Sequence, residues 1–385
     1  MTTRWPSAVS SLRNHHNARL RISRINTPIR SYASKPHLQL QEEDVKRHEK
    51  AALVEITGLR RIDPVNPPRS TLPPPLKFPS RGDANIALYY FRIGRAYGSF
   101  YWVGIKAVWF NYKASQALRE RVKKDARAES TKSLAQATWL KHLSRSEFQL
   151  LERNNHDIGK LPFFGLLVAL FGEWLPLLVP FIPGAVPGTC RIPKQTEGMR
   201  AKAEERRRFS FRRGISEPTR EEMLNTTAEP EDLGKVEWPL SQKEYAAILL
   251  QRLRDDQLFH LSCTLNLHNR LWDRVQLPPP STLLRRGLSK RLAYIASDDK
   301  LLIRDGGASQ VSSDELNIAC EERGLDVLGK REDTLRHDLS WWLARQEEDQ
   351  GKGSAIFTML FRRPNAWKTV TKNQTMAQNP AEKRG

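Results

Sequence analysis

The segment at residues 161–183 constrains this chain most, because it is long and apolar enough to leave water. Fourteen of its 23 residues are Leu, Ile, Val or Phe. Their transfer into hydrocarbon, at about 0.3 to 0.6 kcal/mol each, outweighs a cost of about 3 kcal/mol for the single acid, Glu173. A helix of this length, rising about 1.5 Å per residue, would cross a hydrocarbon core of about 30 Å. The sequence therefore predicts a transmembrane helix at residues 161–183.

Four prolines interrupt this segment and predict that its second half is bent or unwound. Membranes tolerate freed backbone carbonyls only where protein or water covers them, so we expect a homo-oligomer or a partner at the span. An acid within a span usually faces a partner, a cavity or an ion path. Glu173, Pro176 and Pro180 are therefore the candidates for ion coupling. The other interpretation of Glu173, a hydrated residue that serves only helix packing, stays open.

The N-terminal 32 residues have the composition of a mitochondrial presequence. Residues 1–36 carry seven Lys or Arg, and no Asp or Glu precedes Glu42. An Arg-rich, Ser-rich, acid-poor segment is typical of organellar transit peptides. The residues from Arg30 to Ala33 resemble the R-x-Y pattern of the mitochondrial processing peptidase, which predicts cleavage after Tyr32. A basic arm that binds RNA is the alternative.

Residues 33–83 are predicted to be a linker region, because their many prolines favour an extended backbone. Residues 84–160 are predicted to be helical, first amphipathic and then strongly charged. Aromatic residues crowd the part at 86–112, yet its three cations would each cost about 2.5 to 3.5 kcal/mol at the centre of a span. Two interpretations remain open: an amphipathic helix in the membrane interface, or a core helix of a small soluble domain. The cations are Arg92, Arg95 and Lys106.

The C-terminal half is predicted to be helical. Residues 184–237 are charged and poor in large apolar residues, which favours a linker, whereas apolar residues return at helical spacing in residues 238–363. No alternating strand pattern occurs. We therefore expect an all-α chain with one span, a helical domain at 238–363, and a disordered tail at 364–385.

One string within that domain predicts a helix-extended-helix unit. Ser312 stands three residues before Glu315, which is a capping pattern, and Gly324 predicts the end of the helix. The unit resembles the SAP-type DNA-binding motif. Its many acids argue against phosphate binding, so nucleic-acid binding is kept as a second alternative and no DNA partner is expected. These acids are Asp314, Glu315, Glu321, Glu322, Asp326, Glu332 and Asp333.

Catalytic and cofactor motifs do not occur in the sequence. There is no P-loop, no GxGxxG after a strand, no HExxH and no GxSxG, and no calcium loop of the EF-hand type. The three cysteines have no CxxC spacing, which argues against a zinc ribbon. We therefore expect a protein that is not an enzyme and has no cofactor.

Two groups of motifs together resemble the LETM family of mitochondrial inner-membrane proteins. The first runs from Leu143-Ser144-Arg145-Ser146-Glu147 through Gly172-Glu173-Trp174-Leu175-Pro176 to Phe181-Ile182-Pro183-Gly184. The second runs from residues 283–292 through Asp298-Asp299-Lys300-Leu301-Leu302 to Leu335-Arg336 and Trp342-Leu343. The chain departs from the longest members of the family because it has neither their EF-hand nor their C-terminal coiled coils.

The resemblance implies a single-pass protein of the mitochondrial inner membrane whose matrix domain binds the mitochondrial ribosome. It also implies roles in membrane insertion of mitochondrially made proteins and in ion homeostasis. The basic residues expected to face the ribosome lie in the helix at 283–292 and just beyond it. An oligomeric cation/proton exchanger that uses Glu173 is the alternative function. The ribosome-facing candidates are Arg285, Arg286, Lys290, Arg291 and Lys300.

Overall fold

The computed structural model describes residues 63–76, 78–79, 85–128, 140–171, 182, 184, 186–218, 250–275, 277–348 and 354–367. Within these residues every regular element is a helix, which confirms the all-α expectation. The presequence with Tyr32 lies outside the described residues, as do Glu173, Pro176 and Pro180. The elements are η1 (Arg69–Thr71), α2 (Ile86–Ala128), α4 (Arg145–Phe171), η4 (Gly188–Cys190), α6 (Pro193–Arg212), α9 (Asp255–Thr264), α10 (Arg270–Val275), α11 (Ser281–Asp305), η6 (Ala308–Gln310), α12 (Ser313–Glu322), α13 (Glu332–Glu348) and α14 (Ser354–Leu360).

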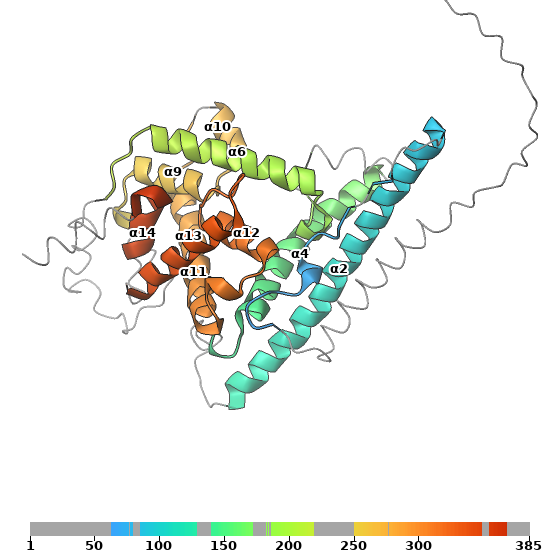
Figure 1. The fold of residues 1–385 in the computed structure, drawn as a ribbon, viewed down its shortest axis with the longest axis horizontal. Helices are drawn as coiled ribbons and strands as arrows, with labels where there is room; N and C mark the ends of the chain where they lie inside the picture. The colour runs from blue at the N-terminus through green and yellow to red at the C-terminus, as the bar shows by residue number, and fades with distance from the viewer. Residues whose placement is uncertain are drawn as a thin grey trace, which may run out of the picture. The chain divides into compact units, whose positions relative to one another are not determined.

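Helices α2 and α4 lie side by side and antiparallel (Figure 1). At one end, Arg121 of α2 pairs with Glu147 near the start of α4 at 2.7 Å. Toward the other end, Phe100 of α2 packs in one buried cluster with Phe164 of α4. The buried residues of α2 recur at helical spacing and so line one face, while Trp102 and other aromatic residues stay exposed on the opposite face. The helix therefore packs like a core helix on one side and resembles an interfacial helix on the other.

Helix α4 contains the first half of the predicted span. It passes through Leu161 and Pro162 without interruption to Phe171, whereas residues 172–181 lie outside the described part of the chain. Among the helices that the structure describes, none is both long enough and apolar enough to cross a bilayer. The first half of the apolar segment is thus the end of a helix that begins at Arg145.

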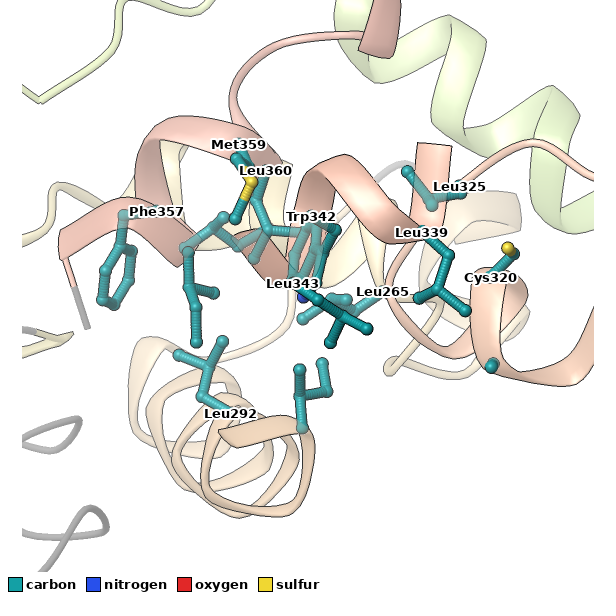
Figure 2. Packing of buried hydrophobic residues seen from close by; sticks show 14 of the residues in the cluster. Leu265, Leu292, Cys320, Leu325, Leu339, Trp342, Leu343, Phe357, Met359 and Leu360 are labelled. Carbon is teal, nitrogen blue, oxygen red and sulfur yellow. The ribbon is translucent and has the colours of Figure 1, made fainter. Parts of the chain in front are cut away.

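A second group of helices shares one apolar core. Leu292 of α11, Leu339 and Trp342 of α13 and Phe357 of α14 meet there (Figure 2). Trp342 is fully buried, and its ring lies 6.0 Å from that of Trp367. Burial of side chains of this size stabilises a core by about 1.5 to 3 kcal/mol each. This core holds the C-terminal helices together.

The helix-extended-helix unit consists of α12, residues 323–331 and α13. The predicted end of α12 at Gly324 is confirmed. Gly324 has φ +78°, and the backbone N–H of Leu325 donates to the carbonyl of Cys320 at 3.0 Å. Ser312 is the N-cap residue of α12, as expected, but its side chain makes no cap hydrogen bond. Glu315 is not free to complete that pattern, since both of its carboxylate oxygens accept hydrogen bonds from Arg153 of α4.

Within the region interpreted as a charged linker, residues 193–212 form α6. Its arginines are stabilised by specific acceptors: Arg207 is buried, pairs with Glu204 at 2.7 Å and donates to the carbonyl of Thr264 at 2.9 Å. Buried arginines that are fully hydrogen-bonded can replace apolar residues in an interface, and a scan for apolar periodicity does not detect them. Helix α6 thereby packs against α9.

The chain packs closely against α2 just before α6. Thr189 and Cys190 of η4 are fully buried and lie against Gly104 of α2. A Cβ atom at Gly104 would stand 2.7 Å from the Cys190 sulfur and 2.8 Å from the Thr189 carbonyl oxygen. The absence of a side chain at Gly104 therefore allows this contact.

We predict that Gly104→Ala destabilises the protein by about 1 to 3 kcal/mol, because overpacking forces the backbone of η4 away from α2. Gly98→Ala is the matched control in the same helix, since a Cβ atom there meets nothing within 4 Å. It should be neutral or stabilising by up to about 1 kcal/mol. Denaturant unfolding of the two variants measures the difference, and equal stabilities would contradict the contact.

Candidate functional site

Two neighbouring acids of α11, Asp298 and Asp299, form the centre of a buried charged network. Arg145 of α4 donates from Nε to Asp298 Oδ1 at 2.9 Å. Arg323, which follows α12, donates from Nη2 to Asp298 Oδ2 at 2.7 Å and from Nε to Asp299 Oδ1 at 2.8 Å. All four side chains are almost fully buried. The network therefore joins three segments that lie far apart in the sequence.

Neutral groups complete the hydrogen bonding of the two acids. Gln149 Nε2 donates to Asp298 Oδ1 at 2.7 Å, and Trp342 Nε1 donates to Asp299 Oδ2 at 2.9 Å. Burial by itself would raise the pKa of Asp298, but Arg145 and Arg323 hold this pKa well below its ordinary value. Asp298 is therefore ionised at physiological pH. Burial raises the pKa of Asp299 above its ordinary value, although Arg323 and the Trp342 indole N–H act in the opposite direction.

Two further contacts fix α4 to the C-terminal helices. Arg153 of α4 forms a bidentate pair with Glu315 of α12 at 2.7 and 2.6 Å. The backbone N–H of Arg145 donates to Asp305 Oδ2 at 2.6 Å. Bidentate arginine–carboxylate pairs fix orientation as well as distance. Helix α4 is thus held at several points along its first half.

The structure brings together two strings that the sequence presents separately, 143–147 and 298–302. Both strings carry the family resemblance, yet the sequence alone assigns no role to Arg145, Asp298 or Arg323. One signal could have revealed the site. Asp299 follows Leu292 and Ile295 and precedes Leu302 at the spacing of the buried face of α11. An acid at an apolar position predicts a buried partner of opposite charge.

The five ribosome-facing candidates divide into two groups. Arg286, Lys290 and Lys300 are exposed on α11. Arg285 donates to the carbonyls of Leu250 and Leu253, at 3.3 and 3.4 Å. Arg291 donates to the Glu322 carbonyl at 3.1 Å and lies over the ring of Tyr294. These last two arginines therefore support the fold.

The exposed candidates do not form one continuous patch. Arg286, Lys290 and Lys300 lie within about 80° of one another around α11, at about 100° per residue. Ala293 and Ser297 share that face and are buried. Arg286 and Lys290 therefore form a basic surface at the N-terminal end of α11, separate from Lys300.

Comparison with known proteins identifies the class to which these helices belong. The family model described as "LETM1-like, RBD" matches residues 143–360. That range begins just before Arg145 and includes the whole charged network. The chain belongs to this family of mitochondrial LETM1-type proteins, which confirms the resemblance noted in the sequence.

Individual relatives are mitochondrial proteins. The "Mitochondrial proton/calcium exchanger protein" of Drosophila melanogaster is 28% identical over 228 residues, which are 53% of this chain and 21% of that protein. The "LETM1 domain-containing protein mdm28, mitochondrial" of Schizosaccharomyces pombe is 26% identical over 234 residues, covering 52% of this chain and 45% of that protein. The chain thus spans less than half the length of either relative. No solved structure matches.

We predict that Asp298→Asn lowers the free energy of unfolding by about 3 to 5 kcal/mol, because two buried guanidinium groups lose their common charged partner. Asp314→Asn is the matched control: Asp314 is exposed, and its pair with Arg69 measures 3.8 Å. Its effect should stay below about 1 kcal/mol. Thermal and urea unfolding test both variants, and a stable Asp298→Asn protein would refute the role of the network.

Proposed function

We propose that this protein binds the mitochondrial ribosome and is held at the inner membrane by the apolar segment at 161–183. One observation about α4 carries the proposal. Near its N-terminal end, Arg145 joins the helix to the C-terminal helices through Asp298. Its C-terminal end, from Leu161 to Phe171, is the first half of the apolar segment. A single rigid helix therefore connects a binding domain to a membrane anchor.

The exposed residues at the end of α4 support membrane attachment. Phe163 is 53% exposed, Leu166 54% and Leu170 67%. These three residues lie on one stripe at i, i+3 and i+7. Large apolar side chains gathered in this way mark a surface that water does not normally cover. The relatives are named as mitochondrial proteins, which supports a mitochondrial location. The inner-membrane location and the matrix side of the C-terminal domain are part of the proposal.

The basic surface of α11 supports binding to a large anionic partner. Arg286 and Lys290 are exposed one helical turn apart. Cations placed in this way attract phosphates and steer association. A ribosome bound beside the membrane would deliver newly made proteins for insertion, and through them the chain would support ion homeostasis. The protein then acts by binding, without catalysing a reaction.

We predict that the double variant Arg286→Ala/Lys290→Ala weakens co-sedimentation with mitochondrial ribosomes about tenfold at low salt. Each lost phosphate contact also reduces the slope of log affinity against log salt by about 1. Lys123→Ala/Lys124→Ala removes the same charge from an exposed part of α2 and is the control. Equal binding by both variants would remove α11 from the interface, and no binding by the unaltered chain would end the proposal.

A second function is favoured by one comparison. The Drosophila relative is named a proton/calcium exchanger, and Glu173 is an acid in the middle of the apolar segment. In this proposal an oligomer of the chain moves a cation against protons through Glu173. Because a neutral amide cannot carry a proton, Glu173→Gln should abolish cation-driven swelling of mitochondria. Swelling at the rate of the unaltered chain would exclude exchange through this residue.

A further inference from the structure

The two flanks of the apolar segment at 161–183 touch each other. The backbone N–H of Gly188 donates to Asp157 Oδ1 at 2.7 Å. Lys160 Nζ donates to the carbonyl of Val186 at 3.4 Å. Asp157 and Lys160 belong to α4 just before the apolar segment, whereas Val186 and Gly188 follow it. The residues that follow the apolar segment therefore lie beside the part of α4 that immediately precedes it.

Packing supports these two hydrogen bonds. Val186 and Cys190 are fully buried in one cluster with Phe164 of α4 and with Phe100 of α2. The hydroxyl of Thr189 donates to the carbonyl of Gly104 in α2 at 3.0 Å. Apolar burial and buried hydrogen bonds at the same place indicate a specific contact. The return of the chain is thus part of the fold.

This contact is incompatible with a simple crossing. A helix of 23 residues measures about 35 Å, and a hydrocarbon core is about 30 Å thick. A span over 161–183 would put its two flanks on opposite faces of the bilayer, roughly 30 Å apart. Hydrogen bonds join these flanks instead.

We propose that the apolar segment is re-entrant, in the sense that its two flanks, Lys160 and Val186, lie at the same face of the membrane and that α4 and α6 begin on that side. This inference rests on the proposed function only in requiring that the segment is attached to a membrane. In this arrangement residues 161–183 insert into the membrane from one face and do not cross it.

The described end of α4 has the size of one leaflet. Residues 161–171 contain no charged side chain, and they extend about 16 Å beyond Lys160, which is about half of the hydrocarbon core. Phe163, Leu166 and Leu170 are exposed along this part of the helix.

Helix α2 supplies the features expected at the level of the headgroups. Trp102 is 61% exposed near Gly104, and Lys106 Nζ lies 5.5 Å from the centre of its ring. Tryptophan is enriched at membrane interfaces, and cations there face lipid phosphates. The helix contains no acid before Glu120. This surface fits a leaflet that contains anionic lipids.

Single cysteines in the full-length chain test the topology. His156→Cys and Lys194→Cys place reporters at exposed positions on the two flanks, and Leu170→Cys places one at the exposed end of α4. A membrane-impermeant maleimide is added to mitoplasts and, separately, to inverted inner-membrane vesicles. The unaltered chain, whose described cysteines are all buried, gives the background.

We expect His156→Cys and Lys194→Cys to be labelled in the same preparation, and Leu170→Cys to be labelled only after detergent is added. Labelling of the two flanks in opposite preparations would overturn the re-entrant segment and leave membrane attachment intact. Labelling of Leu170→Cys in intact membranes would instead overturn the attachment itself. The two failures are therefore distinguishable.

A second measurement uses the contact directly. A Cβ atom at Gly188 would lie 3.9 Å from Cγ of Asp157, so the double variant Asp157→Cys/Gly188→Cys brings two sulfurs within reach of a disulfide after small shifts. We expect an intramolecular disulfide to form in native membranes under mild oxidation. Its absence, with both thiols reactive after unfolding, would contradict the return of the chain.

Discussion

The ion pairs of Asp298 with Arg145 and Arg323 are the interaction on which the arrangement of the helices depends. Removing such charges from water is costly, and the attraction within a dry interior offsets that cost only when every donor and acceptor is engaged. Here each carboxylate oxygen of Asp298 and Asp299 has a partner. The network therefore fixes Arg145 of α4 against Asp298 of α11.

The sequence predicts features of this fold that depend on neighbouring residues. The helical class, the stop at Gly324 and the buried stripe of α11 all follow from local periodicity and backbone preference. The role of Ser312 could not be predicted in the same way, because Glu315 pairs with a residue 162 positions away in the chain. A distant partner decides whether a side chain such as Glu315 makes a local cap or a long-range ion pair, and the spacing of residues does not identify that partner.

The apolar segment illustrates a different limit. Composition measures the free energy of transferring residues 161–183 from water to hydrocarbon, and that quantity is the same for a crossing and for an excursion that returns. Only contacts between the flanks distinguish the two, and these involve Asp157 and Val186, which lie outside the segment. Basic residues present a similar problem. Arg285 and Arg286 are adjacent in the sequence, yet one supports the fold and the other faces solvent.

The continuity of α4 through Leu161 has a mechanical consequence. Its 27 residues form a rod about 40 Å long, fixed by ion pairs near one end and apolar at the other. A rod of this kind acts as a lever. A change of about 10° in its tilt would displace one end by about 7 Å relative to the other, through the dimensions of an α-helix alone. In the proposed membrane attachment, local thinning or curvature of the bilayer would then change the distance between the lipid surface and the C-terminal helices.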